Sequence, residues 1–335
     1  KACQDRLAQN PPPAARGRIQ VRIGDIYAHL GDPDQAVKEW GRVHEVSGGS
    51  PLWEEEAAQR SAAVSLSRGS RSGALQVLAA APGPRPRALR IRLLHDEARD
   101  RLGARRFHEA EAVARVGLAL DPSDPLFHRA LVGAMEGAGR LLYVVGEYET
   151  SVERIPRDPS ARYGLAYAYA SPLFEGRHLD RAVFHLEKAL ELDPRYVYAY
   201  VTLGYVADRL AGRPPRAWPL RSLLAPLRFL DTATGFRRFM AEAGILAPPR
   251  VEKSQDEWRD WAISLYKKGL ALAPEDDAPL KASLLLNTAN SLILLGGGGG
   301  AGPQNLEQAV RFYRLRASMK IPFEVPEQEA LFWYN

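Results

Sequence analysis

A glycine run near residue 300 has the spacing that comes closest to a chemical motif in this chain. Gly297, Gly299 and Gly302 match G-x-G-x-x-G, in which glycines let a loop approach the phosphates of a dinucleotide. Apolar residues at 292–295 precede the run, and a helical pattern follows at 305–317. A dinucleotide site also requires a parallel sheet, and the sequence has no pattern for one. We therefore expect a loosened turn between two helices and no nucleotide cofactor.

Residues that bind metals or act as nucleophiles are dispersed. Seven histidines are scattered along the chain, and none belongs to an H-E-x-x-H motif or a Cys/His cluster. Cys3 is the only cysteine, which excludes an internal disulfide and a thiolate metal site. No nucleophile elbow or paired carboxylates stand out. The sequence thus predicts no catalytic residue, metal or cofactor, and it favours a protein that is not an enzyme.

Arginines concentrate in residues 213–250. The segment has two acidic residues and a net charge of +5, equal to that of the whole chain, from Arg213, Arg216, Arg221, Arg228, Arg237, Arg238 and Arg250. Apolar residues at helical spacing predict an extra helical hairpin there. It either packs on the rest of the protein or docks on an acidic protein or a membrane surface. Nucleic acid is the least favoured partner, since no stacking pattern accompanies the arginines.

The elements that must position such groups are helices in a repeating pattern. The clearest copy, 181–194, has a small residue at Ala182, an aliphatic residue at Leu186, a second small residue at Ala189 and a closing Pro194. The opening small residue recurs at about 36-residue steps, or at longer steps where insertions intervene, at Ala36, Ala74, Ala110, Ala182, Ala262 and Ala309. A single helix pair cannot bury its apolar face, so several stacked copies indicate a solenoid.

This pattern resembles the tetratricopeptide repeat, and the resemblance covers nearly the whole chain except residues 213–250. It implies an all-α, right-handed α-solenoid of stacked antiparallel helix pairs. We expect about five and a half units in residues 1–212, a basic helical insertion at 213–250, and further units in 251–335. The second helix of the sixth unit then follows the insertion, at 256–272, and an eighth unit begins at Glu327.

The resemblance also implies where a ligand lies, because this family mostly binds ligands in the concave groove formed by the first helices of successive units. Carried over by register on Leu203 and Gly204, the groove-facing residues are Tyr198, Val201, Tyr205, Asp208 and Arg209, preceded by Arg162, Leu165 and Tyr169. Tyrosine and arginine are common in protein-binding hot spots. Most neighbouring tyrosines are expected to pack between units instead, namely Tyr163, Tyr167 and Tyr200.

One known ligand class is not supported by these residues. Tetratricopeptide domains that bind chaperones hold a terminal carboxylate with Lys and Asn at fixed groove positions. Those positions here hold Val21 and Asp25, Val201 and Tyr205, and Leu284 and Thr288.

The composition is that of a folded helical protein, with 46% hydrophobic and 25% charged residues. No apolar run is long enough for a membrane span, so we expect a soluble protein, cytoplasmic or periplasmic, with a bacterial composition. The start at Lys1 and the apolar end at 331–335 predict a segment of a longer protein. The function predicted is a scaffold that binds a protein or peptide in its groove. The alternatives are a regulatory or recruiting arm of a larger enzyme or secretion machine, or membrane-surface docking through 213–250.

Overall fold

A computed structural model describes residues 2–174, 178–212, 253–295, 302–319 and 321. Within these ranges the chain is helical and contains no strand. It divides into two compact units, Lys1–Pro122 and Ser123–Asn335. Each unit is a stack of helix pairs, as the repeat pattern predicts for an all-α solenoid.

Unit 1 contains three helix pairs and two short additional helices. The pairs are α2 with α3, α5 with α6, and α7 with α8, and successive pairs pack on each other. The short helices α1 and α4 have no counterpart in the repeat pattern. The bounds are α1 (Ala2–Ala8), α2 (Pro13–His29), α3 (Pro33–Gly41), α4 (Val43–Val46), α5 (Pro51–Ser67), α6 (Arg71–Ala80), α7 (Pro84–Gly103) and α8 (Phe107–Leu120).

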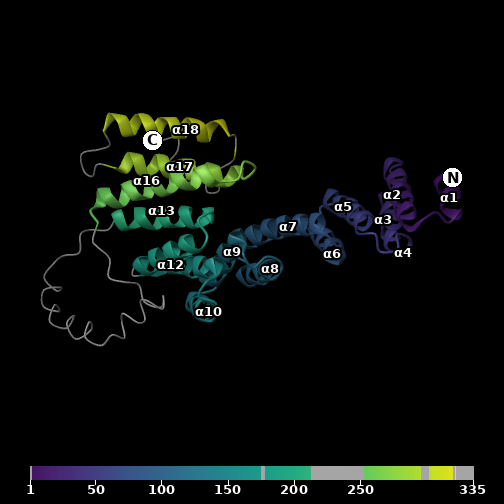
Figure 1. Ribbon diagram of the computed structural model, residues 1–335, viewed down its shortest axis with the longest axis horizontal. Coiled ribbons are helices and arrows are strands. Elements are labelled where there is room, and N and C mark those ends of the chain that lie inside the picture. The colour runs from purple at the N-terminus through teal and green to yellow at the C-terminus, as the bar shows by residue number, and fades with distance from the viewer. Residues whose placement is uncertain (1, 175–177, 213–252, 296–301, 320, 322–335) are drawn as a thin grey trace. The chain divides into compact units, whose positions relative to one another are not determined.

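The described residues of unit 2 form four helix pairs, and Figure 1 shows α13, α16, α17 and α18 lying side by side. The pairs are α9 with α10, α11 with α12, α13 with α16, and α17 with α18. A short 3₁₀ turn, Pro172–Phe174, follows α11. The bounds are α9 (Pro125–Gly137), α10 (Leu141–Arg154), α11 (Pro159–Tyr169), α12 (Leu179–Leu192), α13 (Val197–Ala211), α16 (Gln255–Leu272), α17 (Ala278–Leu294) and α18 (Pro303–Ser318).

The helix starts follow from local sequence. Aspartate N-caps followed by proline open several helices, and the carboxylates of Asp124, Asp158 and Asp277 each accept a backbone N–H of the first turn. Ser254 and Glu257 form a reciprocal capping box that fixes the start of α16. The proline-rich stretch 82–86 separates two helices, because α6 ends at Ala80 and α7 begins at Pro84. Proline is tolerated there because the first turn of a helix needs no N–H donor.

The predicted small residues lie where paired helices cross. Ala36, Ala74, Ala110, Ala182, Ala262 and Ala309 are all buried, with at most 2% of their surface exposed. A larger side chain at these positions would push the helix axes apart. The repeat pattern therefore predicted the crossing points correctly. This includes Ala74 in the second unit, whose sequence matches the pattern poorly.

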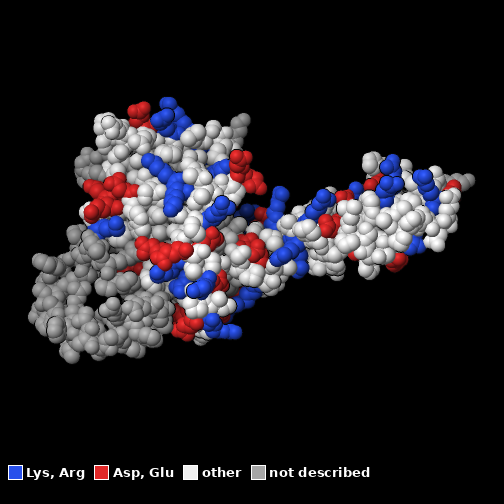
Figure 2. Space-filling model, viewed as in Figure 1, with Lys and Arg blue, Asp and Glu red and all other residues white. Residues whose placement is uncertain are grey.

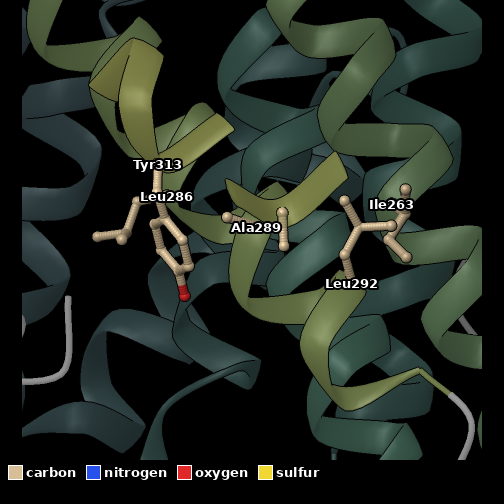
Figure 3. Close-up of a cluster of buried hydrophobic side chains, with 6 residues drawn as sticks. Ile263, Leu286, Ala289, Leu292 and Tyr313 are labelled. Carbon is tan, nitrogen blue, oxygen red and sulfur yellow. The ribbon is translucent and has the colours of Figure 1, made fainter. Parts of the chain in front are cut away.

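The last two pairs share an apolar cluster that joins three helices. Ile263 of α16, three residues of α17 and two of α18 form it. Figure 3 shows Ala289 and Leu292 between Ile263 and Tyr313, with Leu286 beside Tyr313. The side chains that α17 contributes therefore pack on both the preceding and the following helix. A single helix pair cannot bury its apolar face, and this cluster buries it against the neighbouring pair.

At three helix crossings an aromatic ring packs directly against a glycine. A Cβ added to Gly24 would come closer than 3.0 Å to Trp40, one added to Gly164 would do so to Tyr148, and one added to Gly204 to Tyr266. Tyr266 is 1% exposed. These rings lie where any other residue would place its Cβ, so the position requires glycine for space and not for backbone conformation.

Helices α13 and α16 pack as a pair although residues 213–252 separate them in the sequence. These residues lie outside the described ranges, so the bounds 213–250 of the basic insertion stay a prediction. Gly204 and Tyr266 belong to these two helices. Their contact joins residues that are far apart in sequence.

We predict that Gly204→Ala lowers the free energy of unfolding by about 1–3 kcal/mol, because the added methyl overlaps the Tyr266 ring. Gly146 of α10 is the matched control, since nothing lies within 4 Å of a Cβ added there. Gly146→Ala should leave stability unchanged or raise it by roughly 0.5–1 kcal/mol through helix propensity. Urea titrations followed by circular dichroism measure both. Equal effects of the two substitutions would contradict the assigned contact.

Candidate partner-binding surface

The accessible part of the predicted ligand surface lies on α13. Tyr205 is 44% exposed, and Tyr198, Val201, Asp208 and Arg209 are partly exposed. The opposite side of α13 is buried between α12 and α16, which fixes the direction in which these five side chains face. We call these five residues the α13 face.

Tyr198 connects the start of α13 to the start of α17. Its hydroxyl donates a hydrogen bond to Oδ2 of Asp277, at 3.3 Å. The other carboxylate oxygen of Asp277 caps α17 by accepting the backbone N–H of Leu280, at 3.1 Å. Burial, followed by the negative charge of Asp277, raises the pKa of Tyr198, so this phenol stays neutral at physiological pH.

Tyr205 and Arg209 form one ordered surface element near the end of α13. The Arg209 guanidinium carbon lies 5.7 Å from the centroid of the Tyr205 ring, within cation–π range. Nη1 of Arg209 also donates to the carbonyl oxygen of Ala170, at 2.5 Å, at the end of α11. Two partners thus hold this arginine, and the ring beneath it stays partly open to solvent.

The carboxylate of Asp208, a partly exposed residue, connects three helices. Its Oδ2 accepts hydrogen bonds from Tyr266 of α16, at 3.0 Å, and from Ser291 of α17, at 2.7 Å. Its Oδ1 has no hydrogen-bond partner and is buried. Burial raises the pKa of Asp208, and the two hydroxyl donors and Arg259 only partly oppose that effect.

The three predicted surface residues of α11 are buried. Arg162, Leu165 and Tyr169 are 5%, 1% and 4% exposed, so none of them presents a side chain to a partner. The Nε of Arg162 donates to the carbonyl oxygen of Pro156, at 2.8 Å. Tyr163 and Tyr200 are buried as expected, at 0% and 3% exposure.

Two histidine rings cover Tyr169. His178, which follows the irregular turn after α11, lies 5.5 Å from the Tyr169 ring, and His185 stacks on the same ring at 6.0 Å. The Tyr169 hydroxyl donates to Glu149. Burial lowers the pKa of His185 to about 3, so this imidazole is neutral and does not add positive charge.

The predicted basic residues Arg213, Arg216, Arg221, Arg228, Arg237 and Arg238 lie outside the described residues. Over the described ranges, Figure 2 shows basic and acidic side chains interspersed on the visible face. The described helices include none that is long and apolar enough to cross a membrane. In the same residues no group of three or more His, Cys, Asp or Glu side chains could hold a metal ion.

Comparisons with known proteins give only distant similarity. No family model matches the chain, and no curated protein matches it. A thermophilic tetratricopeptide protein of Thermus thermophilus, TTC0263, is 16% identical, with a TM-score of 0.41 over 73% of this chain and 97% of its own. MamA of Desulfovibrio magneticus RS-1 is 20% identical, with a TM-score of 0.27 over 47% and 85%. A human IFIT1 dimer with PPP-AAAA is 13% identical, with a TM-score of 0.25 over 95% and 86%. At TM-scores this low, none of the three bears on what this chain binds.

The buried carboxyl of Asp208 gives a testable pH dependence. Because its pKa is raised above 3.8 in the folded protein, the folded state binds this proton more tightly than the unfolded chain does. Protonation of Asp208 therefore adds stability as the pH falls from neutral toward 3.8, and that contribution is absent above the raised pKa. The Asp208→Asn variant has no proton to bind at this position. As the pH falls over this range, its free energy of unfolding should therefore increase less than that of the parent.

Urea titrations at several pH values between 7 and 4 measure this difference. Asp276→Asn, at an exposed position between α16 and α17, should keep the pH dependence of the parent. An unchanged pH dependence in Asp208→Asn would show that the carboxyl is not the buried group described above.

Proposed function

We propose that the protein is a non-catalytic scaffold that binds a protein or peptide segment on the α13 face. The observation that carries this proposal is Tyr205, the one exposed aromatic residue on a first helix among the described residues of unit 2. In the described part of unit 2, the other exposed aromatic side chain is Tyr143. It lies on α10, which is the second helix of its pair. An exposed tyrosine beside an arginine has the composition of a hot spot.

Preorganisation supports the same proposal. Arg209 is held by the Ala170 carbonyl and by the Tyr205 ring, and Tyr198 is held by Asp277. Side chains that are already ordered lose less entropy on binding, by about 0.5–1.5 kcal/mol for each side chain that would otherwise be immobilised. Because packed helices position all three residues, the surface keeps its shape without a partner.

The chemistry of the α13 face favours a partner segment with both apolar and polar groups. The Tyr205 ring and Val201 offer apolar surface, and the Tyr198 and Tyr205 hydroxyls and the Arg209 guanidinium offer hydrogen bonds. A peptide backbone with interspersed apolar side chains fits this mixture. The buried α11 residues give structural support to the face and are not part of the proposed contact.

Site-specific photo-crosslinking tests the proposal. A photoreactive phenylalanine analogue at position 205 should form an adduct with a partner in cells, and the same analogue at position 143, an even more exposed tyrosine, should not form that adduct. With the partner identified, Tyr205→Ala should weaken binding by about 30-fold, which corresponds to a hot spot of about 2 kcal/mol. Tyr143→Ala should leave the affinity unchanged. The proposal fails if both positions give the same adduct, or if Tyr205→Ala binds as tightly as the parent.

A further inference from the structure

The last described helix, α18, exposes apolar positions that are covered in α12. Leu306 is 45% exposed and Val310 is 43% exposed. The crossing alanines align α18 with α12, so Leu306 and Val310 correspond to Leu179 and Val183. Both of those α12 residues are 0% exposed. The same sequence positions are therefore buried in one second helix and open in another.

The neighbouring pair shows what normally covers this face. Ile263 of α16 is the register equivalent of Val310, and it is 6% exposed. It packs in one cluster with Leu292 of α17, the first helix of the following pair (Figure 3). The residue that follows the crossing alanine thus faces the next first helix. By the same register, Val310 and Leu306 face the place where a further first helix belongs.

We propose that this α18 face binds the chain's own residues 326–335, acting as the first helix of an eighth unit. The segment lies outside the described residues, and its sequence carries the inference: Pro326 is followed by acidic residues and then by an apolar run at 330–334. Proline in the first two positions also opens α9, α11 and α17. The apolar run supplies the side chains that Leu306 and Val310 lack.

Charge complementarity sets the direction of this docking. Arg311 and Arg314 are exposed on α18, beside the apolar face. Short turns in the other units place the start of a first helix next to the end of the preceding second helix, as between α12 and α13. The acidic residues Glu327 and Glu329 would then lie near the last turns of α18 and its arginines. A basic first turn would have been repelled there.

Thiol labelling of the 335-residue chain tests the proposal. Cys3→Ser removes the only natural cysteine, and Val310→Cys places a thiol on the α18 face. With the natural tail this thiol should react with a maleimide about tenfold more slowly than in a chain that also carries Leu331→Asp and Trp333→Asp. A thiol at Leu142→Cys, a position 72% exposed on α10, should react at the same rate with either tail.

Equal rates at position 310 with the two tails would overturn the proposal, whether both are fast or both are slow. A difference between the tails that disappears on dilution would also overturn it, since a second copy of the chain would then be the occupant. Circular dichroism checks that the aspartate substitutions remove no more helical content than residues 326–335 can supply. None of these readouts depends on the α13 face, so failure here leaves the proposed partner surface unaffected.

Discussion

The structure depends on close contact between an aromatic ring and a glycine backbone at the crossing of two helices. Gly204 and Tyr266 show it most clearly, because their helices are separated in sequence by the interval 213–252. Without a Cβ at Gly204, the ring lies directly on the α13 backbone, and the two helices approach closely. Gly24 with Trp40 and Gly164 with Tyr148 repeat the same solution elsewhere. A buried ring contributes a large apolar area at each of these points.

The same tyrosine links packing to the candidate surface. Its ring fixes the distance between α13 and α16, and its hydroxyl donates to Asp208 on the edge of the α13 face. Asp208 in turn accepts from Ser291 of α17, so three helices are held in one register. A carboxylate bonded to two hydroxyls and otherwise buried costs stability, yet it constrains geometry more narrowly than apolar packing does. Tyr205 and Arg209 lie on α13, one of the three helices that these hydrogen bonds connect.

The repeat pattern allowed much of the fold to be predicted, since small residues at crossings and proline after helices have simple steric causes. Ala182 and Ala262 were placed correctly for this reason. The prolines at 82–86 are less informative, because proline both ends helices and opens them: α6 ends at Ala80 and α7 begins at Pro84.

The candidate surface was less predictable. The register placed the α13 residues on a partly exposed face, but it also selected Leu165 and Tyr169, which are buried. Tyr169 is covered by His178, whose position depends on the irregular turn after α11 and follows no repeat rule. The bonds from Asp208 to Tyr266 and Ser291 join residues 58 and 83 positions apart, and no local signal predicts such pairs.

Native-state hydrogen exchange of α13 and α16 tests most directly whether the Gly204–Tyr266 contact holds this part of the protein together. The amides of both helices should exchange with one shared opening free energy, and Gly204→Ala should lower that energy equally in the two helices. The amides of α10 should keep their protection in the same variant, because α10 packs on α9 and α11. Separate opening energies for α13 and α16, or a loss of protection confined to α13, would contradict the account.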